Sequence, residues 1–158
     1  EESLAKALKD VPHLPKGLRD WLVENAWWLV IVGVVFGVIA LFSLIPSLFV
    51  AASFVSAYVG AGYGTAIIIS GVIAIVVLIA TIVIEAMAIQ PLKEKRKRGW
   101  DLLFLSSLIG IGGSLVQAVV SGNVFGGILM AAVTAVIAFY LLFELRPHYL
   151  AKPATVKK

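Results

Sequence analysis

Residues 65–89 read TAIIISGVIAIVVLIATIVIEAMAI, a stretch in which Glu85 is the one ionisable side chain. An α-helix rises 1.5 Å per residue, so about 20 apolar residues cross the roughly 30 Å hydrocarbon core of a bilayer. Three further apolar stretches of comparable character lie at 26–48, 102–120 and 124–145. The sequence therefore predicts an all-α polytopic membrane protein, a four-transmembrane-helix bundle with these four spans.

The composition supports a membrane location. Of the 158 residues, 61% are hydrophobic and 14% are charged, whereas soluble domains carry roughly 25% charged residues. A small globule cannot bury so much apolar surface, because its surface is large relative to its volume. The absence of cysteine excludes disulfides, thiolate metal sites and cysteine nucleophiles.

The distribution of charge predicts the orientation of the spans. All 13 Lys and Arg residues fall in the segments 6–19, 93–98 and 146–158, and the connections 47–64 and 121–123 carry no charge. Basic residues in short loops remain on the cytoplasmic side of the membrane. We therefore expect an N-in/C-in protein of the bacterial inner (plasma) membrane.

The segments that flank the spans are expected to be cytoplasmic. Residues 1–25 form the N-terminal segment, in which 3–10 have the pattern of a short amphipathic, interfacial helix. Residues 146–158 form a basic tail. In the outer connection 46–64, we expect the helix to break at Pro46 and a short helix to lie in the interface, with a re-entrant segment as the alternative.

Small residues mark the expected packing faces, because lipid tails are as apolar as leucine and close approach must hold the helices together. The first span has Gly33 and Gly37, and the fourth has Gly127 and Ala131. The third span carries a polar seam at spacings of three and four residues: Ser107, Gly110, Ser114, Gln117 and Ser121. This seam is either a packing face, with serines bonded to their own helix, or a hydrated path or polar ligand site.

Glu85 is the main candidate functional residue, because an ionisable group inside a span is costly and marks a functional site by default. It shares a stripe with Ser70 and Thr81 and is expected to face the bundle interior. The alternative is an ion pair at the inner interface, in which Lys93, Lys95 or Arg146 reaches Glu85 and Glu144 lies at a similar level. The two interpretations, proton or ion handling and structural pairing, stay open.

The densest charge run contains Lys93, Lys95, Arg96, Lys97 and Arg98. Beside a span, such a cluster attracts anionic lipid headgroups. It lacks the aromatic stacking platform of a single-stranded nucleic-acid site, so no nucleic-acid partner is expected.

The residue inventory disfavours an enzyme. Neither His13 nor His148 lies within a span, no paired acids lie in the membrane, and no motif for a metal or cofactor is present. We expect no catalytic residues, no cofactor and no metal. The most favoured function is a non-catalytic four-helix membrane protein that acts through helix–helix or lipid contacts, as an accessory subunit or homo-oligomer. The alternative is a small proton-coupled transporter or channel that uses Glu85 and the seam.

Overall fold

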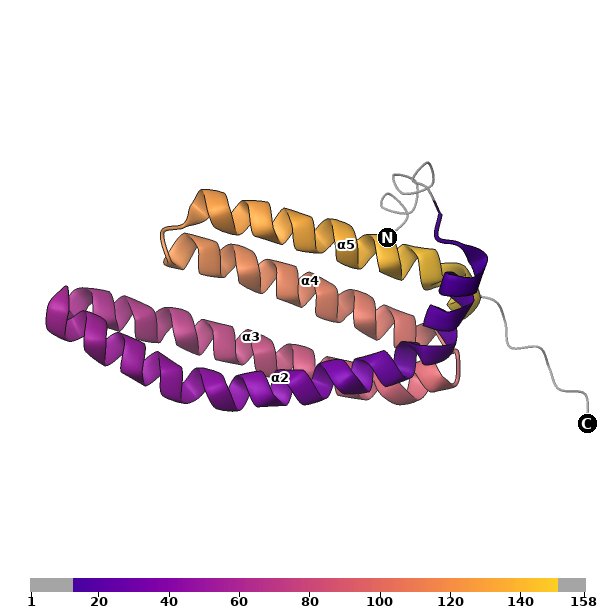
Figure 1. Ribbon diagram of the computed structural model, residues 1–158, viewed down its shortest axis with the longest axis horizontal. Helices are drawn as coiled ribbons and strands as arrows, with labels where there is room; N and C mark the ends of the chain where they lie inside the picture. Colours follow the sequence, from indigo (N-terminus) through magenta and orange to yellow (C-terminus); the bar gives the residue numbers. More distant parts are fainter. Residues whose placement is uncertain (1–12, 151–158) are drawn as a thin grey trace, which may run out of the picture.

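The computed structural model describes residues 13–150, which form four α-helices joined by short turns (Figure 1). The helices are α2 (Lys16–Tyr58), α3 (Ala61–Lys93), α4 (Lys97–Val120) and α5 (Val124–Leu150). All four are long and apolar enough to cross a membrane, and no strand occurs among the described residues. The predicted all-α class is confirmed. The amphipathic helix expected at 3–10 lies outside the described residues.

Each expected span lies inside one helix, but the helices extend beyond the predicted boundaries. Helix α2 begins at Lys16, so the segment expected to precede the first span is partly continuous with it. Helix α5 continues to Leu150 and includes the first part of the expected tail. Pro147 lies inside this helix and does not end it.

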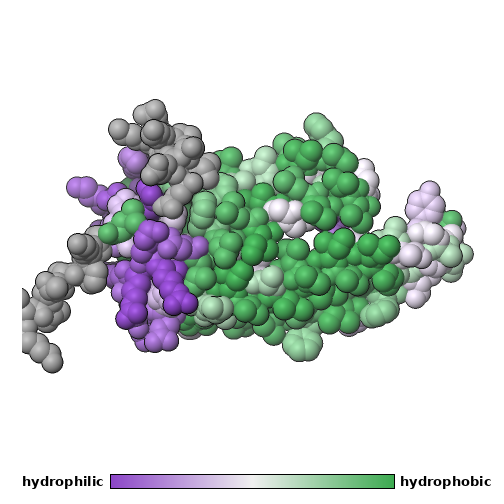
Figure 2. Space-filling view, turned by 180° about the vertical axis from the view of Figure 1, so that it is seen from behind, coloured by the Kyte–Doolittle hydropathy of each residue, from purple (hydrophilic) through white to green (hydrophobic). Residues whose placement is uncertain are grey.

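The helices alternate in direction, and their charged ends lie at the same end of the molecule (Figures 1 and 2). We call the end at which α2 begins, α3 ends, α4 begins and α5 ends the charged end. Figure 2 shows hydrophilic residues gathered there and a hydrophobic surface along the helices. The opposite end, which contains the turns after Tyr58 and Val120, has no charged residue.

The packing is sequential rather than that of a closed bundle. Helix α3 packs along α2, α4 along α3 and α5 along α4, whereas α2 and α5 make few contacts with each other. The α2–α3 hairpin also extends past the α4–α5 hairpin at the uncharged end (Figure 1). The four-helix bundle expected from the sequence is therefore open along one side, between α2 and α5.

The expected helix break at Pro46 is wrong, because α2 continues through it to Tyr58. Proline has no amide hydrogen, so the carbonyl of Phe42, four residues earlier, loses its helical donor. The hydroxyls of Ser43 and Ser47 donate to other carbonyls of the helix, those of Ile39 at 3.0 Å and Leu44 at 2.9 Å.

Packing against α3 explains why the helix continues beyond Pro46. Leu48 and Ala52 are buried, at 8% and 6% exposure. Leu48 lies against Gly71, and Ser56 lies against Gly64, so close that neither glycine has space for a Cβ atom. At 43 residues α2 is about 65 Å long, which exceeds one crossing, and its last turns project with the α3 start beyond the other hairpin.

The turns at the uncharged end depend on backbone conformations that favour glycine. Gly60 has φ 134° and Gly122 has φ 72°, both in the region that side chains disfavour. Asn123 then caps α5, because its Oδ1 accepts a hydrogen bond from the Gly126 amide at 3.2 Å. These groups end one helix and begin the next within a few residues.

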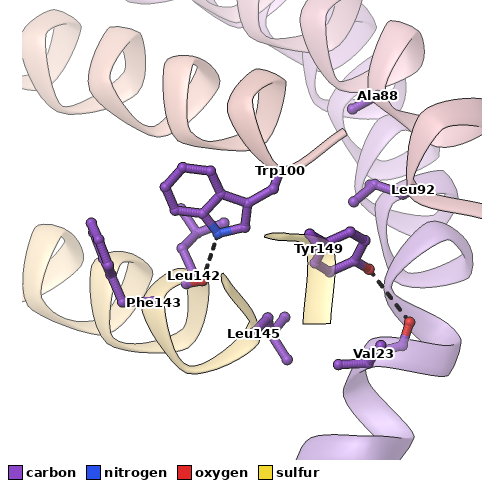
Figure 3. Close-up of a cluster of buried hydrophobic side chains, with 8 residues drawn as sticks. All are labelled: Val23, Ala88, Leu92, Trp100, Leu142, Phe143, Leu145 and Tyr149. Atoms are coloured by element: carbon purple, nitrogen blue, oxygen red, sulfur yellow. Dashed lines mark hydrogen bonds between the residues drawn. The ribbon is translucent and has the colours of Figure 1, made fainter. Parts of the chain in front are cut away.

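A cluster of buried hydrophobic side chains lies at the charged end and joins all four helices (Figure 3). Trp100 of α4 is 1% exposed, and its Nε1 donates to the Leu142 carbonyl of α5 at 2.6 Å. The Tyr149 hydroxyl donates to the Val23 carbonyl of α2 at 3.4 Å, and Leu92 of α3 completes the cluster at 1% exposure. Here α2 and α5 meet.

Small residues hold neighbouring helices together over the remaining length. A Cβ atom at Gly37 of α2 would lie 2.9 Å from the Ile82 side chain of α3. At Gly113 of α4, it would lie 2.6 Å from Cγ1 of Val77. Gly127 of α5 lies directly against Ala118 of α4.

Gly113→Ala is expected to lower the free energy of unfolding by about 1–3 kcal/mol, the usual cost of overpacking. Val77 cannot rotate away, because β-branched side chains have one preferred rotamer in a helix. The matched control is Gly110→Ala in the same helix, where a Cβ atom meets nothing within 4 Å. Thermal unfolding of both variants in detergent tests this, and equal midpoints would contradict the close α3–α4 contact.

Candidate functional site

A pocket of about 240 Å³ lies in the half of the molecule nearer the charged end, and all four helices line it. Its walls are largely apolar, with Leu22 and Ala26 of α2 on one side and Ala138 of α5 on another. Glu85 of α3 and Ser107 of α4 supply polar groups to its lining. Such a pocket, apolar with few polar groups, has the composition of a ligand site.

Glu85 is half-buried and lies where α2, α3 and α4 meet. Its Oε1 accepts a hydrogen bond from the Ser106 hydroxyl of α4 at 3.1 Å. On the α2 side lies Gly33, where a Cβ atom would be 3.8 Å from the Glu85 Oε2. Glu85 therefore lies between helices, as its expected interior position requires. The sequence analysis did not identify its partner Ser106, which is one residue before the predicted seam.

The cations expected near Glu85 lie against aromatic rings. The Nζ of Lys93 lies 5.3 Å from the centre of the Trp27 ring. The guanidinium carbon of Arg146 lies 5.8 Å from the ring centres of both Trp100 and Phe143. Within residues 13–150, Glu85 has a hydroxyl partner in place of the expected ion pair.

Glu144 belongs to a separate cluster that links the start of α2 to the end of α5. Its Oε2 lies 2.9 Å from Nδ1 of His13, and its Oε1 lies 3.6 Å from Nη1 of Arg19. Its side chain is only 5% exposed. Nearby, Nε2 of His148 lies 3.7 Å from Oδ1 of Asp20. From the sequence we expected Glu144 at the level of Glu85 and did not identify Arg19 as its partner. The available signal was the position of Arg19 in the basic segment before the first span.

The predicted polar seam of α4 does not form one continuous feature. The hydroxyls of Ser107, Ser114 and Ser121 donate to carbonyls of their own helix, at 3.0, 2.9 and 3.3 Å. Only Gln117 reaches another helix, where its Nε2 donates to the buried Ser70 hydroxyl of α3 at 3.1 Å. Gly110 has open space around it.

The α4 face that packs on α3 combines Gln117 with two residues outside the predicted seam, Ser106 and Gly113. The interval of seven between Ser106 and Gly113 corresponds to two helical turns, so the three residues share a face. The signal was present in the sequence, but the neighbouring row of serines obscured it.

The packing residues predicted on the first and fourth spans lie at helix contacts. Gly33 and Gly37 of α2 face α3, and Gly127 of α5 lies against α4. Ala131 of α5 is buried, at 4% exposure. Gly37 thus packs tightly on α3, whereas Gly33 lies beside Glu85 and stays exposed.

The basic run forms the end of α3, a tight turn and the start of α4. Two of its members have acidic partners close in sequence: Arg96 Nε lies 2.6 Å from Oε2 of Glu94, and Lys97 Nζ lies 2.6 Å from Oδ1 of Asp101. The turn places Lys95 at φ 53°. Lys93, Lys95 and Arg98 complete the run at the exposed charged end.

Glu144→Gln is expected to lower the free energy of unfolding by roughly 1–3 kcal/mol, because it removes the charge that Arg19 faces inside the protein. Glu24→Gln is the control, since Glu24 is an exposed acid of α2 near the same end. Thermal unfolding in detergent compares the two variants. If they unfold alike, the Glu144 cluster does not hold α2 to α5.

In the described part of the chain, no three His, Asp or Glu side chains lie close enough to hold a metal ion. No protein-family model, curated protein or solved structure matches the chain.

Proposed function

We propose that this chain is an integral protein of the bacterial plasma membrane with both termini in the cytoplasm. The one-sided distribution of charge supports this orientation. Basic residues crowd the end at which α2 begins, α3 meets α4 and α5 ends, whereas the turns at the other end are uncharged. The positive-inside rule places the basic end in the cytoplasm.

We infer that the protein is non-catalytic and acts through contacts with lipids and with other membrane helices, as an accessory subunit or homo-oligomer. The apolar surface that the protein exposes is the observation that supports this function. Large apolar side chains point outward along the helices, among them Phe42 at 72%, Phe125 at 85% and Val136 at 66% exposure. A surface of this kind is stable only against hydrocarbon or another apolar helix.

Two features narrow the kind of contact. Gly37 already packs on Ile82 of α3, and the large apolar side chains of another outward face, such as Phe125 and Val136, are available to a second subunit. The basic turn around Lys95 would lie at the headgroup level, where it attracts anionic lipids.

A second candidate function is a small proton-coupled transporter or channel. It is favoured by Glu85, which lines a pocket to which all four helices contribute. The serine hydroxyls of α4 argue against transport, because those of Ser107, Ser114 and Ser121 donate to carbonyls of their own helix. Among the described residues they therefore do not form a continuous row of polar groups along a path.

The proposed orientation predicts which turns a membrane-impermeant maleimide reaches from outside intact cells. The chain has no cysteine, so single substitutions are unambiguous. Val59→Cys and Ser121→Cys should react from outside, because both residues lie at the uncharged end. Lys16→Cys and Lys95→Cys should react only after permeabilisation. The reverse pattern would overturn the orientation, and labelling of all four from outside would overturn membrane insertion.

The proposed contact function predicts no proton flux above that of empty liposomes when the protein is reconstituted. The measurement is a pH-sensitive dye inside proteoliposomes, with wild type, Glu85→Gln and the exposed control Glu24→Gln compared under an imposed proton gradient. Native mass spectrometry of the same samples should show bound lipid or a second subunit. Flux in wild type that Glu85→Gln abolishes would establish the transport alternative instead.

A further inference from the structure

The pocket around Glu85 opens sideways. Its lining includes Leu29 of α2 and Leu141 of α5, two helices that make few contacts with each other. They meet at the charged end through Tyr149 and Val23, so the pocket lies just beyond the point where they part. A molecule dissolved in the surrounding hydrocarbon reaches the pocket between α2 and α5 without passing through a helix.

The carboxylate in this pocket is not matched by a cation of the described chain. The Ser106 hydroxyl engages Oε1 of Glu85. The nearest basic side chain along the chain, Lys93, lies over the Trp27 ring, and Arg19 of α2 lies beside Glu144. A carboxylate among apolar walls attracts a positive charge strongly, because the surroundings screen it poorly.

The space beside the carboxylate admits a small head group. On the Oε2 side of Glu85 the neighbour is Gly33, which has no side chain and is exposed; a Cβ atom there would be in ordinary contact with Oε2, at 3.8 Å. The pocket volume of about 240 Å³ exceeds the roughly 150 Å³ of a cavity that binds benzene. This volume is enough for a compact head group and the first carbons of an alkyl chain.

We propose that this pocket binds a long-chain primary amine, with the ammonium group on the Glu85 carboxylate and the alkyl chain leaving between α2 and α5 into the lipid. A primary ammonium fits because it is compact and donates charge-assisted hydrogen bonds to a carboxylate. This binding activity goes beyond the contact function proposed above and rests only on the membrane placement. It requires no transport.

The test uses the full chain in nanodiscs of zwitterionic lipid and radiolabelled dodecylamine, with empty nanodiscs as the measure of partitioning. Saturable binding is expected for wild type and for Glu24→Gln. Glu85→Gln keeps the shape but removes the charge, so affinity should fall about tenfold or more, a loss of at least about 1.4 kcal/mol. Ala138→Leu fills the pocket from α5 and should weaken binding similarly. Dodecanol, with the same chain and no charge, should compete poorly.

Several results would overturn the proposal. Equal affinities for wild type and Glu85→Gln would remove the carboxylate from the site. Competition by dodecanol as strong as by unlabelled dodecylamine would show a pocket for neutral lipid chains. Absence of saturable binding would remove the site altogether. If Glu85→Gln does not fold, as judged by thermal unfolding, Ala138→Leu and the dodecanol comparison still decide. The maleimide labelling is independent, so failure of binding and failure of membrane placement are distinguishable.

Discussion

Helices in a bilayer gain little by exchanging lipid contact for contact with another apolar helix, because both surroundings are hydrocarbon. This constraint governs the structure. Neighbouring helices associate where one of them offers a residue small enough for close approach, as at Gly37, Gly113 and Gly127. The contacts follow the order of the chain, so each helix packs mainly on the helix before it and the helix after it. Nothing of this kind joins α2 to α5 over most of their length.

At the charged end, polar and aromatic side chains make the contacts between α2 and α5 that small residues do not make elsewhere. There Trp100 and Tyr149 bury large rings and direct their polar atoms to backbone carbonyls of other helices. Glu144 and Arg19 add an ion pair between α5 and α2. Aromatic rings with a polar edge suit the interface of a membrane. The polar and aromatic contacts that join α2 to α5 therefore lie at the end of the molecule where the charged residues are concentrated.

The pocket around Glu85 follows from these two modes of packing. Because α2 and α5 are joined at one end and sparsely in contact elsewhere, a lateral opening lies next to their junction. Glu85 is eight residues before Lys93, about 12 Å along the helix. The acid therefore lies inside the apolar part of the structure but close to the charged end. This position suits the long-chain amine that we propose as a ligand, because the molecule has a polar head and an apolar chain.

Much of the architecture could be predicted from the sequence. The run of apolar residues at 65–89 and its three counterparts determine four membrane-length helices, since only a helix satisfies its own backbone in hydrocarbon. The clustering of Lys and Arg determines which helix ends lie together. Glycine at 33 and 37 indicates a packing face, and an acid at 85 indicates a candidate site. Each of these features depends on residues close together in the sequence, so it can be recognised from the sequence of one protein.

Tertiary structure alone decided the rest. Pro46 would end a helix by its own chemistry, yet the contact of Leu48 and Ala52 with α3 keeps α2 helical beyond it. Two adjacent serines, Ser106 and Ser107, have the same residue chemistry, and only the rotation of α4 against α3 directs Ser106 to Glu85. The partner of Glu144 likewise depends on how α2 crosses α5. A pairing between distant residues follows from helix rotation and crossing, which packing determines and local composition does not.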